Sequence, residues 1–318
     1  MEGKGQIMND KPSILIVGAG AIGSFYGAIL KKAGCSVSTV LRSDYEAVRA
    51  QGIRITSTLG DLSYEPDHVY RDGDLPDEAP DFLILCVKVL PGVDRVALVA
   101  PWMGEKTRLV LIENGLDIER ELADAYPDNP LISCLAFIAV SRTESGIVEH
   151  KSYGKLVMGR YPEGVDENCR VLSQLFTEGG INIDLTERVV GERWRKCLWN
   201  TPFNPLSVVA NGADTRTILD TEGGEELIRA MMREVMVVAA AEGYPMDEAL
   251  IDKYIEGTRK MPAYKNSMAL DYLNGRPIER EAVLGNVVTL AGCHGIAVPH
   301  LNTVLVTLKM RAALEGRE

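Results

Sequence analysis

Three polar residues stand four apart in an apolar segment near the middle of the 318-residue chain. Lys196, Asn200 and Asn204 occur in RWRKCLWNTPFNPLSVV, and an interval of four places side chains on one face of a helix. Apolar neighbours would partly desolvate the lysine and lower its pKa towards values useful for proton transfer. Amides can orient a substrate without adding charge. The pattern indicates either a solvated stripe or the polar wall of a substrate site.

The same segment carries Pro202 and Pro205, which should bend or end the helix because proline lacks a backbone N–H. The shared face is therefore a firmer expectation for Lys196 and Asn200 than for Asn204.

A glycine-rich turn near the N-terminus predicts a dinucleotide site. The apolar run SILIV is followed by GAGAIG, with Gly18, Gly20 and Gly23 in the spacing GxGxxG, and then by a helical pattern. In a strand–turn–helix unit these glycines allow the tight turn, the approach of a pyrophosphate and the packing of helix on strand. Free N–H groups at the start of the helix then bind phosphate. The predicted cofactor-binding residues of this turn are Gly18, Ala19, Gly20, Ala21, Ile22 and Gly23.

The end of the second predicted strand, TVLRSD, bears on the identity of the dinucleotide. Arg42 ends this strand, and an arginine there accommodates the 2′-phosphate of NADP, whereas an acidic residue holds the ribose hydroxyl of NAD. Asp44 follows two residues later and could instead face a ribose. Arg42 could also be an ordinary solvated arginine. We favour NADP(H).

Two further buried strands are followed by polar residues, Lys88 in LILCVK and Asn114 in LVLIEN. Ligands of open parallel sheets bind outside the carboxyl ends of the strands. We therefore expect Gly18, Lys88 and Asn114 to converge on one crevice, although either polar residue alone could be a surface or capping residue.

The order of predicted elements indicates an α/β protein with two domains. Strands alternate with helices up to about residue 187, which predicts a doubly wound, mainly parallel sheet. The region 52–66 reads as a hairpin and 131–160 as a β-rich stretch with a central turn. From 188 onwards almost all periodicity is helical. The expected organisation is a flexible segment 1–12, a dinucleotide-binding domain 13–187 and a helical substrate domain 188–318, with a cleft between the domains.

Composition narrows the classes of partner. The formal net charge of -11 disfavours nucleic acid and anionic membrane surfaces. The six cysteines are scattered singly and suggest no metal site, which favours reduced thiols of a cytoplasmic protein. We find no signal peptide and no run of membrane-spanning length. Apolar stretches such as MMREVMVVAAA could form a homodimer interface or the core of the domain itself, and both alternatives stay open.

A later segment, NSMALDYLNGRPIERE, holds Ser267, Asp271 and Glu279. Ser267 and Asp271 share a helix face, but Ser267 could be an ordinary helix cap, and Glu279 could be a surface acid.

Taken together, these motifs resemble the ketopantoate reductase (2-dehydropantoate 2-reductase) family over essentially the whole chain. The resemblance rests on GAGAIG, CVK, ENG, RKCLWNTPFNPLSVV, SMALDYLNGRPIE and GNVV, in the order of the family. It implies an N-terminal Rossmann domain, a C-terminal helical domain and NADPH-dependent reduction of 2-dehydropantoate to (R)-pantoate for coenzyme A synthesis. It also implies a role for each matched residue. Lys196 would be the general acid, and Glu279 would be the acid that positions lysine and substrate. The substrate-binding residues would be Asn114, Asn200, Asn204 and Ser267. Arg42, Lys88 and Asn114 would bind the cofactor together with the glycine turn.

The chain departs from the family pattern at Tyr264, where the family often has asparagine three residues before the matched serine. This change alters the expected substrate pocket. One alternative is therefore a reductase of another 2-oxo acid, or a β-hydroxyacid dehydrogenase, on the same scaffold. A second is an NADP-binding sensor without catalysis, which would have no evident need of a lysine proton donor.

Overall fold

The computed structural model describes residues 11–316, and the chain divides into two compact units. Unit 1 comprises the described residues up to Val87, Asp94–Glu113 and Glu119–Val189, and unit 2 comprises Lys88–Val93, Asn114–Ile118 and the chain from Val190 on. The expected flexible segment 1–12 lies, up to residue 10, outside the described residues.

Unit 1 is built on one ten-stranded sheet in the order β4-β3-β9-β8-β7-β6-β1-β2-β5, with β10 paired to β9. Its strands are β1 (Ser13–Val17), β2 (Ser36–Leu41), β3 (Ile53–Ser57), β4 (Leu62–Tyr64), β5 (Val69–Arg71), β6 (Phe82–Leu85), β7 (Arg108–Ile112), β8 (Leu131–Glu144), β9 (Ile147–Arg160) and β10 (Ile183–Leu185). Strands β8, β7, β6, β1, β2 and β5 run parallel, and the two antiparallel pairs are β3–β4 and β8–β9. The predicted mainly parallel sheet and the predicted hairpin at 52–66 are confirmed.

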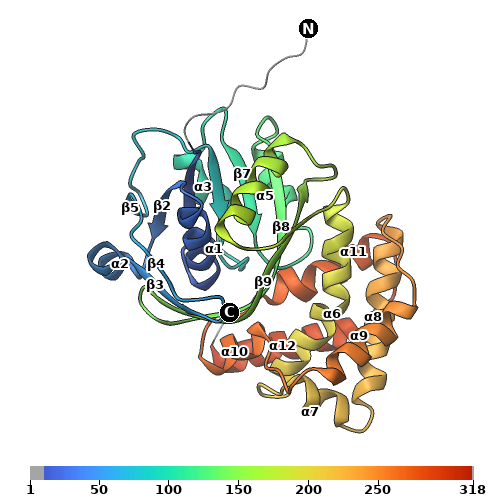
Figure 1. Cartoon of the computed structure of the whole chain (residues 1–318). Coiled ribbons are helices and arrows are strands. Elements are labelled where there is room, and N and C mark those ends of the chain that lie inside the picture. The colour runs from blue at the N-terminus through green and yellow to red at the C-terminus, as the bar shows by residue number, and fades with distance from the viewer. Residues whose placement is uncertain (1–10, 317–318) are drawn as a thin grey trace. The chain divides into compact units, whose positions relative to one another are not determined.

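Helices cover both faces of this sheet (Figure 1). The helices of unit 1 are α1 (Ala21–Lys32), α2 (Tyr45–Gln51), α3 (Arg95–Val99), η1 (Ala100–Trp102), α4 (Arg120–Ala125) and α5 (Glu167–Gly179). On one face α1 and α5 bury Phe25, Tyr26 and Phe176, and on the other α3, η1 and α4 bury Val99, Trp102 and Leu122. The central strands are apolar on both faces for this reason, as expected of a doubly wound sheet.

Unit 2 is helical, and its helices are drawn in yellow to red in Figure 1. They are α6 (Val189–Val209), α7 (Thr215–Asp220), α8 (Gly224–Ala241), α9 (Ala249–Lys260), α10 (Ser267–Leu273), the π-helical turn η2 (Glu281–Gly285), α11 (Asn286–Cys293) and α12 (Pro299–Glu315). Trp194, Leu198 and Phe203 of α6 are buried in a core with Met231 and Val235 of α8. The predicted α/β domain followed by a helical domain is thus the fold of the chain.

One local prediction is partly wrong, because α6 does not end at Pro202 or Pro205. Both prolines lie inside a helix that continues to Val209. Their missing N–H groups weaken the helix, but Phe203, between them, is fully buried. Packing of an apolar face supplies most of the stability of a helix in a protein and here exceeds the local cost. As a result Asn204 lies on the same helix as Lys196 and Asn200.

The described residues hold neither a membrane-spanning helix nor a metal-binding cluster. Between residues 11 and 316 none of the helices combines the length and the hydropathy that a transmembrane segment needs. In residues 11–316 no group of three or more His, Cys, Asp or Glu side chains is placed to hold a metal ion. The six cysteines are all free thiols, and four of them are buried.

Candidate active site

The glycine turn connects β1 to α1 in unit 1. Gly18 has φ +88°, a conformation that side chains rarely adopt, and a Cβ there would lie 2.6 Å from Val87 Cγ1. A Cβ at Gly23 would lie 2.6 Å from the carbonyl oxygen of Gly18, so only glycine lets α1 pack this close to the turn. The first and third glycines are therefore required by the protein itself.

Gly20 is different, because among the described residues no atom beyond its two chain neighbours lies within 4 Å of the position that its Cβ would take. Packing within unit 1 does not demand glycine there, whereas the close approach of a pyrophosphate would. Gly20 is also the N-cap of α1, and no side chain caps this helix start. An uncapped helix N-terminus beside open space fits the phosphates of a dinucleotide.

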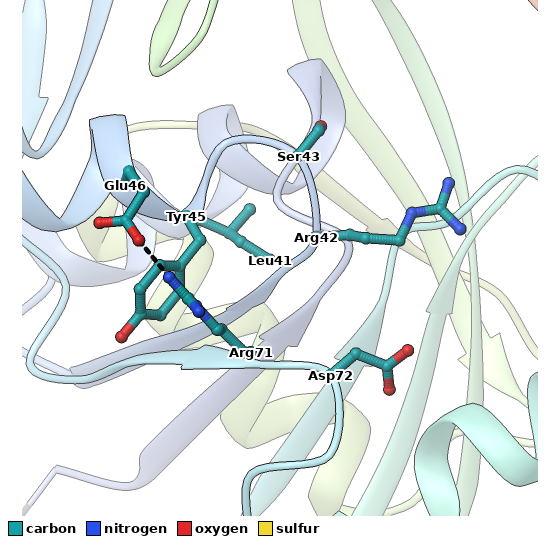
Figure 2. A pocket seen from close by; sticks show the side chains of 7 residues that line it. All are labelled: Leu41, Arg42, Ser43, Tyr45, Glu46, Arg71 and Asp72. Atoms are coloured by element: carbon teal, nitrogen blue, oxygen red, sulfur yellow. Dashed lines mark hydrogen bonds and ion pairs between the residues drawn. The ribbon is translucent and has the colours of Figure 1, made fainter.

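Arg42 directly follows β2 and lines a cavity of about 290 Å³ together with Leu41, Ser43, Tyr45, Glu46, Arg71 and Asp72 (Figure 2). Arg42 and Ser43 are exposed, so both can reach a ligand. Asp44, by contrast, is 4 % exposed and its carboxylate accepts a hydrogen bond of 2.7 Å from Arg142 Nη1 of β8. Ser43 and Ser145 hydroxyls also donate to Asp44 Oδ1. Asp44, the acid that could have bound a ribose hydroxyl, is thus hydrogen-bonded to other residues of unit 1.

In unit 2, Lys196 of α6 lies beside Asn114, which follows β7 in the chain. Lys196 Nζ donates a hydrogen bond of 2.8 Å to Asn114 Oδ1. Burial lowers the pKa of Lys196 from 10.5 to about 8, and the positive charge of Arg193, one helical turn earlier, acts in the same direction. The side chain is therefore a cationic acid that can release its proton near neutral pH.

Glu279 is the second titratable group with a strongly shifted pKa in this cluster. Burial raises the pKa of Glu279 from 4.5 to about 7, against the opposing effects of the Val89 N–H bond and the charges of Lys88 and Lys196. Its Oε1 accepts a hydrogen bond of 3.1 Å from Val89 N. The two groups that a carbonyl reduction would use thus have pKa values that bracket physiological pH.

Lys88 belongs to the same cluster but has partners of its own. Its ammonium group lies 2.7 Å from Asp271 Oδ2 and donates to the Pro277 carbonyl oxygen at 2.9 Å. Asp271 also accepts a bond from Arg276. We call Lys88, Asn114, Lys196, Asp271 and Glu279 the lysine cluster.

The remaining predicted substrate residues lie in α6 and at the start of α10. Asn200 is partly buried one turn after Lys196, and Asn204 is 5 % exposed. Asn204 Oδ1 is buried with no hydrogen-bond partner among the described residues, which leaves a strong acceptor for a ligand.

Asn266, not Ser267, caps α10 by accepting a hydrogen bond from Ala269 N, so the capping interpretation of Ser267 is wrong. Asn266 also bonds Ser207 and Phe203 of α6, which holds the exposed Ser267 next to the turn that carries Asn204.

Comparison with known proteins identifies the family. The model of "Ketopantoate reductase PanE/ApbA" matches residues 14–163, and that of "Ketopantoate reductase PanE/ApbA C terminal" matches residues 188–312. The chain belongs to the ketopantoate reductase family. The 2-dehydropantoate 2-reductase of Nostoc sp. is 32% identical over 98% of this chain and 97% of its own. The crystal structure of 2-dehydropantoate 2-reductase from Methylococcus capsulatus is 47% identical, has a TM-score of 0.90, and covers 95% of this chain and 97% of its own.

The fold is also that of a D-mandelate dehydrogenase solved with NADH and anilino(oxo)acetate, at a TM-score of 0.89 and 17% identity over 96% of this chain and all of that one. At this identity the likeness concerns the fold alone. Members of the ketopantoate reductase family are NAD(P)-dependent oxidoreductases that act on CH–OH groups, and the chain is an oxidoreductase of this class.

Three features of the site were not predicted from the sequence. Arg193 was not singled out, although its position one turn before Lys196 could have suggested an influence on the lysine. Arg71 lies in β5, a three-residue strand too short to be recognised from its pattern. The Val89 N–H that binds Glu279 is a backbone group, and the sequence carries no signal for it.

Proposed function

We propose that this protein reduces 2-dehydropantoate to (R)-pantoate with NADPH, for coenzyme A synthesis, and that Lys196 is the general acid. The observation that supports this most directly is the environment of Lys196, bonded to Asn114 at 2.8 Å with its pKa lowered to about 8. A solvated surface lysine would have neither feature. The family membership and the identity of the relatives support the substrate.

NADPH, when bound, supplies the hydride. Lys196 Nζ donates a proton to the 2-oxo oxygen of the substrate as negative charge develops there. Asn114 Oδ1 accepts a hydrogen bond from the same ammonium group and keeps it oriented. With a pKa of about 8, Lys196 is mostly protonated at pH 7 and loses its proton to a developing alkoxide readily.

Glu279 positions the lysine and the substrate. Its carboxylate is held by the Val89 N–H, and its negative charge favours the protonated form of Lys196. Asn204 Oδ1, which is buried and has no hydrogen-bond partner within residues 11–316, accepts a hydrogen bond from the hydroxyl group of the substrate, and Asn200 lies on the same helix face. The exposed Ser267 hydroxyl donates to the substrate carboxylate.

For the cofactor we propose the glycine turn (Gly18 to Gly23), Arg42, Lys88 and Asn114. The preference for NADPH over NADH is supported by the exposed Arg42 and by the burial of Asp44 in its contact with Arg142. Lys88 can take part only by sharing its ammonium group with Asp271 or leaving it.

The test is oxidation of the reduced cofactor by purified protein, followed by the absorbance of the nicotinamide. The substrates are 2-dehydropantoate, 2-oxoisovalerate and benzoylformate, each with NADPH and with NADH. We expect rapid turnover only with 2-dehydropantoate and NADPH. Faster turnover with benzoylformate would assign the protein to another 2-oxo acid and direct attention to Tyr264. Tight NADPH binding with no turnover of any acid would favour the sensor.

A further inference from the structure

The cavity beside Arg42 is lined by a second arginine, Arg71, which is not among the cofactor-binding residues proposed so far. We call this hollow in unit 1 the Arg42 cavity. It has a volume of about 290 Å³ and is lined by Leu41, Arg42, Ser43, Tyr45, Glu46, Arg71 and Asp72. A phosphate group is small enough to enter such a space.

The sheet register brings the two arginines to the same edge. Strands β2 and β5 are parallel neighbours, and Leu41 of β2 pairs with Arg71 of β5. Both strands therefore end at the same level, with Arg42 the next residue after β2. The carboxyl ends of parallel strands are where ligands of these sheets bind. Arg71 thus lies where the phosphate next to the second strand would be held.

Arg71 now contacts groups that it can leave at little cost. Figure 2 shows its side chain lying across Tyr45 towards Glu46, whereas Arg42 extends away from them. Its guanidinium forms an ion pair with Glu46 and lies 4.2 Å from the centre of the Tyr45 ring. The side chains of Arg71 and Glu46 are 57% and 77% exposed. Exposed ion pairs of this kind contribute little stability, because water and salt screen them.

A phosphate monoester is a stronger partner for Arg71 than the Glu46 carboxylate. It carries close to two negative charges at neutral pH and offers three acceptor oxygens. Guanidinium groups bind such oxygens through two parallel hydrogen bonds. The acidic groups that line the cavity, Glu46 and Asp72, oppose an anion unless both arginines turn towards it.

We propose that Arg71 is a second binding residue for the 2′-phosphate of the cofactor and that it exchanges Glu46 for this phosphate when the cofactor binds. The inference rests on the proposed use of NADPH. It assigns the choice of cofactor to an arginine pair, Arg42 and Arg71, on two neighbouring strands, and makes Glu46 a competitor that weakens phosphate binding.

The experiment measures dissociation constants by calorimetry for NADPH and NADH, and for adenosine 2′,5′-bisphosphate and AMP as probes of the adenosine half. The variants are Arg71→Ala and Glu46→Gln. The matched control is Arg49→Ala, because Arg49 is exposed, carries the same charge and also contacts Tyr45, yet does not line the cavity.

We expect Arg71→Ala to weaken NADPH and the bisphosphate about tenfold, the loss typical of one charged hydrogen-bonding group, and to leave NADH and AMP unchanged. Glu46→Gln should tighten NADPH about twofold to threefold, because the competing carboxylate is gone. Arg49→Ala should change none of the four constants.

The outcomes separate this inference from the proposed function. If the wild-type protein prefers NADPH and Arg71→Ala retains that preference, Arg71 has no part in it and the inference is wrong while the proposed function stands. Equal weakening of NADPH and NADH would mean that Arg71 only supports the local structure. A wild-type protein that binds NADH as tightly as NADPH would overturn both.

Discussion

The cofactor region of unit 1 and the lysine cluster of unit 2 use charge in opposite ways. In the cofactor region the cations Arg42 and Arg71 are exposed, and Arg71 forms an exposed ion pair with Glu46. In the lysine cluster Lys196 and Glu279 are desolvated, and their pKa values lie near 8 and 7. An arginine stays charged in either setting, whereas lysine and glutamate gain or lose a proton as their surroundings change.

The difference follows from the task of each region. Binding a phosphate requires a permanent charge that water can reach before the ligand arrives, so exposure does no harm. Proton transfer at neutral pH requires a group whose charged form is only slightly favoured, and burial is what achieves this. We therefore expect substitutions of Lys196 and Glu279 to affect turnover, and substitutions of Arg42 and Arg71 to affect affinity.

The largest effect should come from Lys196→Ala. Loss of the general acid should lower kcat about a thousandfold, within the usual range for such groups, while the dissociation constant of NADPH stays within about twofold. Steady-state kinetics and a binding titration measure the two quantities. Lys253→Ala in α9 is the control, because Lys253 is an exposed lysine of the same unit. Near-normal turnover in Lys196→Ala would remove the lysine from the mechanism.

Arg42→Ala should have a smaller effect, and on affinity alone. We expect the dissociation constant of NADPH to rise about thirtyfold, because a charged contact to the 2′-phosphate is lost, and that of NADH to stay the same. Because Arg42 is exposed, the difference between wild type and variant should shrink as salt is raised. An equal loss for both cofactors would place Arg42 outside the phosphate site and weaken the contrast between the regions.

The pH profile of kcat/KM should be bell-shaped, with its maximum between about 7 and 8. Above pH 8 the rate should fall about tenfold per unit as Lys196 loses its proton, and below pH 7 it should fall as Glu279 becomes protonated.

In Glu279→Gln the acidic limb should disappear. The alkaline limb should move to lower pH, because the carboxylate charge raises the pKa of Lys196. Glu281→Gln, which changes a carboxylate paired with Arg280, is the control and should leave the profile unaltered. An unchanged profile in Glu279→Gln would contradict the coupling of the two groups.

The smallest expected effect is on stability. The pKa of Lys196 is lower in the folded protein than its ordinary value of 10.5, so the folded state disfavours the charged lysine at every pH below about 8. Lys196→Met should therefore raise the free energy of unfolding at pH 7 by about 1 kcal/mol. This gain is smaller than the free energy that corresponds to the whole pKa shift of Lys196, because Asn114 loses a hydrogen bond in the variant. Denaturant titration measures this quantity.

The gain should diminish as pH rises from 8 towards 10.5, where the lysine is neutral in both states. Lys253→Met, at an exposed position, should show no gain at either pH. A loss of stability in Lys196→Met at pH 7 would mean that the bond to Asn114 outweighs the cost of burying the charge.

The sequence alone predicted the features whose causes are local. The glycine turn occupies six consecutive positions between a strand and a helix, so its conformation and its use can be read from neighbours in the chain. The helical face of Lys196, Asn200 and Asn204 follows from an interval of four. The doubly wound sheet and the helical unit follow from patterns that repeat every few residues. The predicted roles of the site residues remain to be tested by the variants above.

Only the tertiary structure decided which groups meet. Asn114 contacts Lys196 across 82 positions, Val89 contacts Glu279 across 190, and Arg142 engages Asp44 across 98. No local pattern records these pairs, because they depend on how strands and helices far apart in the chain pack. The shifted pKa values of Lys196 and Glu279 likewise come from burial, which the folded protein imposes and an isolated segment lacks. Residue type and spacing thus determined which chemistry was available, and long-range packing determined where it could take place.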